Sequence, residues 1–360
     1  MNTSTITPER ISFEKGLYLY EHAPLEELRK MASSIRHILH PHNYVTYIPN
    51  SNPNYTNICS SKCSFCAFCR NKEDPDSFFK TKEEVLDHFA FADRHGVKQV
   101  LLQGGINEKV TLEYLLDLVS AAKEHFPHIH PHFFSAIEIA HAANISNVPL
   151  QKALEMLYEK GLKTIPGAGA EILSKRVREK ISPRKLSAEK WLELHELAHT
   201  IGFKTTATMM FGHIENSEDI LIHFDALRTI QDKTHGFLSF IPWSQKPNTK
   251  SMGDIYLRLI AFSRIYLDNF PHIGASWFSE GKEVGKKALH YGADDFGGTL
   301  LEENVHKACN FINQTSIAEV RQIIEDAGFE PIERDCFYLI NDAQHLLSPS
   351  FPKSQREVNH

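Results

Sequence analysis

The sequence contains no run of about eighteen apolar residues, so no membrane-spanning helix is expected. Its first ten residues lack a basic segment followed by an apolar one, which argues against a secretory leader and favours a cytoplasmic protein. The 39 basic and 45 acidic residues form no block of like charge and give a net charge of -6. We therefore expect neither nucleic acid nor a membrane surface as a partner, but a small-molecule substrate.

Cysteine is also scarce, and three of the six cysteines lie close together. Cys59, Cys63 and Cys66 have the spacing Cys-x3-Cys-x2-Cys. This spacing can give a [4Fe-4S] cluster three thiolates and leave its fourth iron without a protein ligand. Such an iron can chelate S-adenosyl-L-methionine (SAM) and reduce it, which yields methionine and a 5'-deoxyadenosyl radical. The spacing, with the aromatic Phe65 before the third cysteine, resembles the signature of the radical SAM superfamily.

Two other metal sites are compatible with this region. Zinc usually takes four ligands from two Cys or Cys/His pairs, and a second cysteine pair is absent. Cys69 extends the run by a further Cys-x2-Cys step, so a fully ligated electron-transfer cluster or a zinc site that uses Cys69 is the alternative. Our main interpretation is that Cys59, Cys63 and Cys66 bind the cluster and Cys69 does not.

Strand-like and helical segments alternate along the chain. Residues 8–42 have apolar residues at helical spacing and precede the first strand. The strand-like segments are residues 44–55, 99–103, 132–136, 163–165, 205–211, 237–243, 273–278 and 289–293. This alternation predicts an α/β fold, a TIM-type (β/α)8 barrel of the radical SAM kind, with a six-unit open barrel as the alternative. We expect an N-terminal helical extension (1–43), the barrel (44–346) and a flexible C-terminal tail (347–360).

Reactive groups of such a barrel lie on the loops after the strand C-termini. Gln103, Gly104 and Gly105 follow the second strand, and backbone without Cβ atoms can approach SAM closely. Glu138 follows the third strand and can accept hydrogen bonds from SAM, although a carboxylate that favours a helix N-terminus is an equal interpretation. With Phe65 near the adenine, these residues are the predicted SAM pocket.

Two further loops carry candidate residues. The small residues of segment 166–172 follow the fourth strand, and we expect them to open a helix and to suit close approach of a ligand. His213 and Glu215 follow the fifth strand, where packing alone does not explain polar side chains. His128, His130 and His132 alternate as a metal triad would, but Pro131 interrupts them, so we do not expect a metal there.

Several blocks together resemble the radical SAM enzymes of the futalosine route to menaquinone. These blocks are residues 54–68, 101–105, 167–173, 206–213 and 240–243, and the resemblance covers about residues 15–340. Residues 181–185, Trp243 and residues 292–297 are most similar to the cyclic dehypoxanthinyl futalosine synthases within that family. Two positions depart from the pattern: Cys69 stands where the family usually has tyrosine, and Ala168 where it usually has a third glycine.

The resemblance implies a cyclisation of dehypoxanthine futalosine. The deoxyadenosyl radical would abstract the ribose C4' hydrogen, and the carbon radical would add to the benzoate ring, which then loses an electron and a proton. An external one-electron donor such as flavodoxin or ferredoxin would reduce the cluster. The alternatives are the aminodeoxyfutalosine synthase reaction and a non-enzymatic Fe-S electron carrier.

The protein groups that this reaction needs are a base and a partner for the benzoate carboxylate. The candidate bases are Glu171, His213 and Glu215. The candidate carboxylate partners are Arg176, Arg178 and Lys185.

Overall fold

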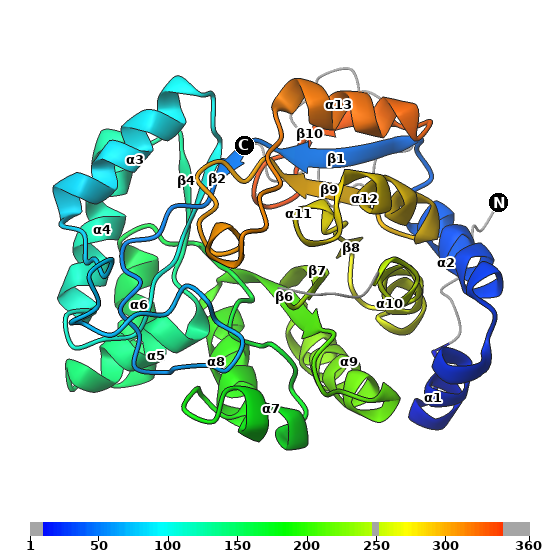
Figure 1. The fold of residues 1–360 in the computed structure, drawn as a ribbon, viewed down its shortest axis with the longest axis horizontal. Helices are drawn as coiled ribbons and strands as arrows, with labels where there is room; N and C mark the ends of the chain where they lie inside the picture. Colours follow the sequence, from blue (N-terminus) through cyan, green and yellow to red (C-terminus); the bar gives the residue numbers. More distant parts are fainter. Residues whose placement is uncertain (1–9, 247–251, 341–360) are drawn as a thin grey trace.

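Two amphipathic helices precede the first strand in the computed structural model, which describes residues 10–246 and 252–340 (Figure 1). Helix α1 spans Phe13–His22 and α2 spans Leu25–Leu39. The buried residues Leu28 and Ala32 of α2 pack against Ala261 and Ile265 of helix α10 (Gly253–Tyr266). The extension is thus fixed to the barrel by a small apolar core of its own.

The strands form a parallel barrel. Strands β2 to β8 make a seven-stranded sheet in sequence order, and β10, β1 and β9 make a three-stranded sheet. One residue, Pro49, separates β1 from β2, and a bridge between Gly274 and Asp295 joins the end of β8 to β9, so the two sheets form one ring. The strands are β1 (Tyr44–Ile48), β2 (Asn50–Ser51), β3 (Gln99–Leu102), β4 (His130–Phe133), β5 (Thr164–Ile165), β6 (Lys204–Phe211), β7 (Phe237–Ser244), β8 (His272–Ile273), β9 (Asp295–Gly298) and β10 (Glu330–Glu333).

This ring confirms the predicted α/β barrel. The extra strand β10 pairs with β1 in parallel. None of the described helices combines the length and apolar character that crossing a membrane requires. The predicted tail, residues 347–360, and the predicted end of the barrel at 346 lie outside the described residues.

Helices cover the outside of the ring (Figure 1). Thr81, Ser135 and Asn216 form complete capping boxes at the starts of α3, α5 and α9. The covering helices are α3 (Lys82–Arg94), α4 (Leu112–His125), α5 (Ala136–Ile145), α6 (Leu150–Glu159), α7 (Lys175–Ile181), α8 (Ala188–Ile201), α9 (Ser217–Thr234), α10, α12 (Lys282–Ala288) and α13 (Ile317–Asp326), whereas the short helix α11 (Trp277–Glu280) lies inside this layer, after β8.

The last two predicted strands are wrong in their positions. The strand expected at 273–278 ends at Ile273, and α11 begins at Trp277. The strand expected at 289–293 is a 3₁₀ helix, Leu289–Tyr291, and the strand that closes the ring is β9. The sequence does not predict β9 because Asp294 and Asp295 lie at its start, and unpaired carboxylates are not expected in a barrel core.

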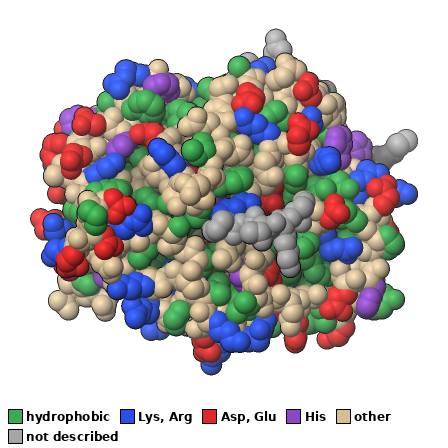
Figure 2. Space-filling view, viewed as in Figure 1, with side chains coloured by type: hydrophobic (Ala, Val, Ile, Leu, Met, Phe, Trp, Pro, Cys, Tyr) green, Lys and Arg blue, Asp and Glu red, His purple; other side chains and the backbone are tan. Residues whose placement is uncertain are grey.

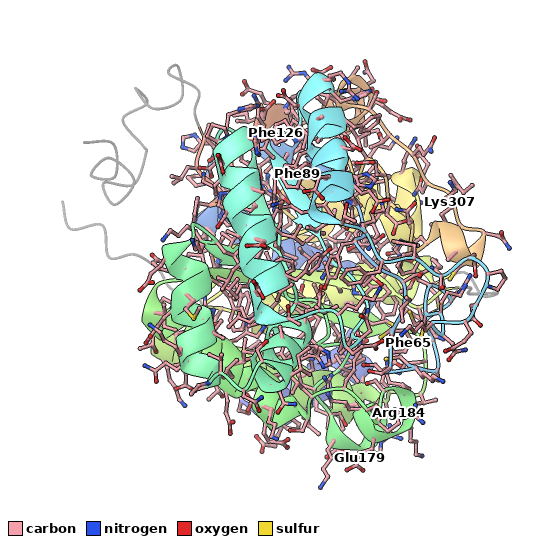
Figure 3. The ribbon with its side chains drawn as sticks, turned by 90° about the vertical axis from the view of Figure 1, so that its left-hand side faces the viewer. Phe65, Phe89, Phe126, Glu179, Arg184 and Lys307 are labelled. Atoms are coloured by element: carbon pink, nitrogen blue, oxygen red, sulfur yellow. The ribbon has the colours of Figure 1, made fainter. Side chains whose placement is uncertain are left out.

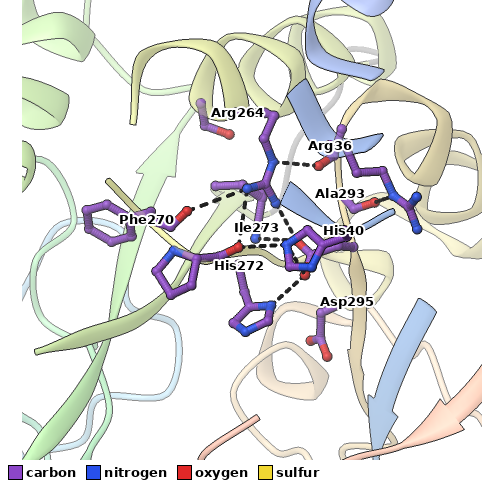
Figure 4. Close-up of polar contacts among 12 residues, drawn as sticks. Arg36, His40, Arg264, Phe270, His272, Ile273, Ala293 and Asp295 are labelled. Carbon is purple, nitrogen blue, oxygen red and sulfur yellow. Dashed lines mark hydrogen bonds and ion pairs between the residues drawn. The ribbon is translucent and has the colours of Figure 1, made fainter. Parts of the chain in front are cut away.

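Buried arginines explain how both carboxylates are tolerated. Asp295 accepts from Arg334 Nε at 2.5 Å and from Thr46 Oγ1 at 2.7 Å, which joins β9 to β1 and to the end of β10. Asp294 pairs with Arg264 of α10, whose side chain is fully buried (Figure 4). The pairs of Asp295 with Arg334 and of Asp294 with Arg264 therefore hold β9 to the neighbouring elements.

Asp294 also has two histidine neighbours. His272 Nδ1 lies 2.5 Å from its carboxylate, and His40, at the end of α2, lies 3.3 Å away. Although burial alone would raise the pKa of Asp294, His40, His272 and Arg264 hold it well below its usual range. These two histidines and Asp294 have the atoms of a metal site, but Arg264 already supplies the positive charge, so we interpret the group as structural.

We predict that Asp294→Asn lowers the free energy of unfolding by about 3–5 kcal/mol, because Arg264 is left buried without its counter-ion. Thermal unfolding followed by circular dichroism measures the change. The control is Glu26→Gln, which removes an exposed ion pair with Arg29 and should leave the melting temperature unchanged. Equal melting temperatures for the two variants would contradict the structural role of Asp294.

Candidate active site

The cysteines lie in a long loop that covers one end of the barrel. Residues 52–80, the cysteine loop, connect β2 to α3 and contain only isolated bridges and turns. Cys59 N–H donates to Arg70 O at 3.1 Å within the loop, and Ser60 N–H donates to Ile106 O at 2.8 Å after β3. Ser64 N–H donates to the Ile181 carbonyl at the end of α7 at 3.0 Å. Backbone hydrogen bonds therefore fix the cysteine loop to the loop after β3 and to the end of α7.

Cys59, Cys63 and Cys66 line one cavity of about 380 Å³ that extends into the barrel. None of the three forms a disulfide. Burial raises the pKa of the Cys63 thiol to about 12 and also raises the pKa of Cys66, so both are neutral until a metal displaces the proton. Cys69 and Cys336 line the cavity as well, but the three cysteines with the spacing Cys-x3-Cys-x2-Cys can supply the three thiolates of a [4Fe-4S] cluster with one open iron.

Cys69 lines the same cavity but has a partner of its own. Its thiol donates to the Cys59 carbonyl at 3.3 Å. This hydrogen bond closes the cysteine loop on itself, in a position where the resemblance leads one to expect tyrosine. The contact gives Cys69 a partner within the loop itself.

Phe65 and two charged residues form one group beside the cysteines. Lys185 pairs with Glu171, and its ammonium lies 5.4 Å from the Phe65 ring centroid. Although burial lowers the pKa of Lys185, Glu171 and Cys63 raise it above the usual value, so the side chain is charged. Figure 3 shows Phe65 on the same side of the barrel as Lys307, which belongs to the loop after β9.

Glu171 has an unusual backbone conformation. Its φ is 45°, in the left-handed region that non-glycine residues seldom adopt, and only 4% of the residue is exposed. Met210 N–H donates to its carbonyl at 2.7 Å, which anchors this geometry to β6. The segment 166–172 is not the start of a helix as predicted, because α7 begins only at Lys175. The glycine at 167 allows close backbone packing, since a Cβ there would lie 2.4 Å from the Thr206 carbonyl.

Glu138 lines the cavity, but protein donors already occupy its carboxylate. It accepts from Tyr55 Oη at 2.6 Å, from Gly104 N–H at 2.9 Å, and from Ser135 N–H and Oγ at 2.7 and 2.6 Å. The structure therefore shows the alternative that the sequence left open, a carboxylate that caps the start of a helix. The predicted role as a hydrogen-bond acceptor for SAM stays a prediction. Glu138 ties the start of α5 to the base of the cysteine loop.

Gln103, Gly104 and Gly105 line the cavity as predicted, but the glycines are needed mainly by the protein itself. A Cβ on Gly104 would lie 2.6 Å from the Tyr55 ring, and one on Gly105 would lie 2.3 Å from the Ile58 carbonyl. The missing side chains make room for the cysteine loop.

His213 and Glu215 are absent from the described residues that line the cavity. Glu215 accepts from Gly212 N–H at 2.5 Å and from His213 N–H at 2.9 Å, and His213 Nε2 donates to Met210 O at 2.9 Å. Gly212, with φ of 88°, turns the chain after β6, so both side chains stabilise this turn. Both side chains thus have their partners within this turn and not among the described residues that line the cavity.

Two of the three predicted carboxylate partners are also used elsewhere. Arg176 is half exposed and pairs with Asp219. Arg178 is buried and donates to the carbonyls of Gly169, Ala170 and Leu186. Only Lys185 of the three lines the cavity.

Arg334 and His306 are among the cavity-lining residues that the sequence analysis did not select. Arg334 lines the cavity because β10 pairs with β1, a long-range contact without a local signal. His306 follows β9 in an irregular loop whose course the sequence does not reveal. On the face shown in Figure 2, Lys and Arg side chains are interspersed with Asp and Glu, as the even charge pattern of the sequence suggests.

Known families match almost all of this chain. The model of the radical SAM superfamily matches residues 53–227, and that of the CofH/MqnC C-terminal region matches residues 234–346. Cyclic dehypoxanthine futalosine synthase of Streptomyces coelicolor is 36% identical over 98% of this chain and 90% of its own. Aminodeoxyfutalosine synthase of Thermus thermophilus is 40% identical over 92% of each chain. A 5-amino-6-(D-ribitylamino)uracil–L-tyrosine 4-hydroxyphenyl transferase of Methanopyrus kandleri is 37% identical over 82% of this chain and 84% of its own.

A solved structure agrees on the fold. The hydrogenase maturase HydG from Carboxydothermus hydrogenoformans has a TM-score of 0.72 at 17% identity, over 92% of this chain and 78% of that one. The resemblance inferred from the sequence is thus confirmed. The chain belongs to the radical SAM superfamily, in the group with the CofH/MqnC C-terminal region, and is an enzyme that uses a [4Fe-4S] cluster and S-adenosylmethionine.

Proposed function

We propose that this enzyme cyclises dehypoxanthine futalosine to cyclic dehypoxanthinyl futalosine in menaquinone biosynthesis. One observation favours this reaction over that of the aminodeoxyfutalosine synthases. The three segments that resemble the cyclases most each contribute to the wall of the cysteine-lined cavity, through Lys185, Trp243 and Asp295 with Gly297. Overall identity does not separate the candidates, because an aminodeoxyfutalosine synthase is 40% and a cyclic dehypoxanthine futalosine synthase 36% identical.

When bound, the cluster and SAM supply a 5'-deoxyadenosyl radical that can take the C4' hydrogen of the substrate. Cys59, Cys63 and Cys66 would hold the cluster, and Phe65 with residues 103–105 would border SAM. The protein's part is to position the substrate and keep water and other hydrogen donors away. The enclosed barrel and apolar side chains such as Ile48, Leu101 and Ile241 in its wall suit that task.

The ring must finally lose a proton, and Glu171 is the base we propose. Of the three candidate bases, it is the one that lines the cavity within the described residues. Its strained backbone conformation fixes the carboxylate beside Lys185, and such strain is typical of functional positions. Lys185, as a cation at the cavity wall, would also attract the benzoate carboxylate.

We further propose that the reaction takes place in the cytoplasm with flavodoxin or ferredoxin as the one-electron donor. Cys59 and Cys66 are only partly buried, so the cluster would lie near the protein surface. A short path through the cysteine loop favours electron transfer from an external protein.

The second candidate is the aminodeoxyfutalosine synthase reaction, which the identity to the Thermus thermophilus enzyme favours. In that reaction the adenosyl radical adds to an enolpyruvyl double bond and stays in the product. The electron-carrier alternative does not account for a cavity inside the barrel.

The fate of the adenosyl group tests the proposed function. Anaerobic incubation of the reconstituted enzyme with SAM, reductant and C4'-deuterated dehypoxanthine futalosine should release deuterated 5'-deoxyadenosine. The organic product should be two hydrogens lighter than the unlabelled substrate, as measured by mass spectrometry. Adenosine retained covalently in the product of a futalosine-type substrate would instead establish the second candidate.

We predict that Cys69→Ala retains about four irons per chain after anaerobic reconstitution, as the unaltered protein does. Cys63→Ala should lose most of this iron, because it removes one of three ligands. Iron and sulfide determination, with the visible absorption of the cluster, measures both variants. A Cys69→Ala protein as poor in iron as Cys63→Ala would show that Cys69 is a ligand.

We predict that Glu171→Gln slows cyclised product formation by about 100-fold or more, the usual worth of a catalytic base. Deuterated 5'-deoxyadenosine should still form from the labelled substrate, because hydrogen abstraction precedes proton loss. The matched control is Glu215→Gln, which lies off the cavity and should retain turnover within a few-fold of the unaltered enzyme. A larger loss in Glu215→Gln than in Glu171→Gln would reverse the assignment.

A further inference from the structure

His306 is a buried side chain whose hydrogen-bonding capacity is unused. It lies just before the 3₁₀ helix η2 (Lys307–Cys309), in the loop after β9, and only 9% of the residue is exposed. Neither Nδ1 nor Nε2 has a hydrogen-bond partner. Buried polar groups are nearly always paired, because an unpaired one loses the hydrogen bonds of water without replacement. The ring lines the same cavity as the cysteines.

Aromatic side chains enclose the imidazole. The ring centroid of His306 lies 6.0 Å from that of Trp243 and 5.4 Å from that of Phe278. Phe311 is the third aromatic neighbour, at 6.2 Å. These surroundings bury both ring nitrogens, while the residue itself contributes to the cavity wall, so a small rotation of the side chain would bring a nitrogen to a ligand there.

The charge state of His306 determines what it can bind. Burial, with Lys246 nearby, lowers its pKa to about 4, so at neutral pH one ring nitrogen donates and the other accepts. Lys246 and Glu303 are charged groups near it, and Glu303 Oε1 lies 3.8 Å from His306 Nδ1, beyond hydrogen-bond distance. Glu303 also lines the cavity. A neutral hydroxyl group suits His306 and Glu303 better than a carboxylate does, because the Glu303 side chain would repel a carboxylate.

The position of His306 favours the substrate over SAM as the source of that hydroxyl. Trp243 is in β7 and Phe278 in α11 after β8, whereas Gly104 and Glu138 follow β3 and β4. In the strand order of the ring these pairs lie on opposite sides. His306 thus lies on the side of the barrel opposite Gly104 and Glu138, which belong to the predicted SAM pocket.

We propose that His306, with Glu303 beside it, forms a sugar-hydroxyl subsite in which the imidazole donates to and accepts from ribose hydroxyls. The sugar is that of the substrate or that of SAM. Assignment to the substrate rests on the proposed function, in which the ribose must be held so that C4' faces the radical. Binding supplies the two hydrogen bonds that the free protein lacks.

The test compares His306→Leu with His306→Asn in cluster-loaded protein under anaerobic conditions. Calorimetry gives the affinities for SAM and, with SAM present, for dehypoxanthine futalosine. His306→Leu should weaken substrate binding by about 10- to 100-fold, the worth of one or two hydrogen bonds, and leave SAM affinity unchanged. His306→Asn keeps a donor and an acceptor and should recover most of the affinity.

Thermal unfolding of the same variants without ligand separates binding from a structural role. His306→Leu should melt at a higher temperature than the unaltered protein, because it removes a buried unpaired polar group. If His306 had only a structural role, its replacement would lower the melting temperature of the protein. The expected pattern is therefore a more stable protein that binds its substrate less well.

Each result decides between defined alternatives. Unchanged affinities for both ligands in His306→Leu would overturn the subsite. Weaker binding of SAM alone would assign the hydroxyl to the SAM ribose. Failure of the unaltered protein to bind dehypoxanthine futalosine would contradict the proposed function, and the SAM affinities alone would then decide for or against the subsite.

Discussion

Three thiols can hold one iron–sulfur cluster only if their loop is fixed, yet the cysteine loop contains no regular helix or strand. The Glu138 carboxylate provides the central constraint. It binds the Tyr55 hydroxyl at the start of the loop, the Gly104 amide after β3 and the cap of α5 at Ser135. Four donors on one buried carboxylate join three segments that are far apart in sequence. The close fit of Gly104 and Gly105 against the loop depends on this junction.

The barrel keeps the ends of its strands in place by a second set of buried charges. Asp294 and Asp295 at the closing strand are neutralised by Arg264 and Arg334, which come from α10 and from the end of β10. Because these pairs are desolvated, breaking one leaves a charge that the interior cannot stabilise. The cavity is thus enclosed by fixed walls, which suits chemistry that must be protected from water.

Local patterns predicted much of the fold and the centre of the site. Cysteine spacing predicted that Cys59, Cys63 and Cys66 act together, and the structure places all three in the wall of one cavity. The features that the sequence did not predict depend on contacts between residues far apart in the chain. The closing strand carries Asp295, which is acceptable because Arg334 pairs with it from the end of β10. His213 lies in the turn that begins at Gly212 and is not among the described residues that line the cavity. His306 reaches the cavity through an irregular loop, for which sequence periodicity gives no signal.

The central claim is that three cysteines hold a cluster whose fourth iron is open to SAM inside the barrel cavity. Mössbauer spectroscopy of protein reconstituted with ⁵⁷Fe tests it directly. Addition of SAM should change the spectrum of one iron site of the four and leave the other three as they were, because only that iron gains new ligands. A spectrum with four thiolate-ligated irons that SAM does not change would contradict the account.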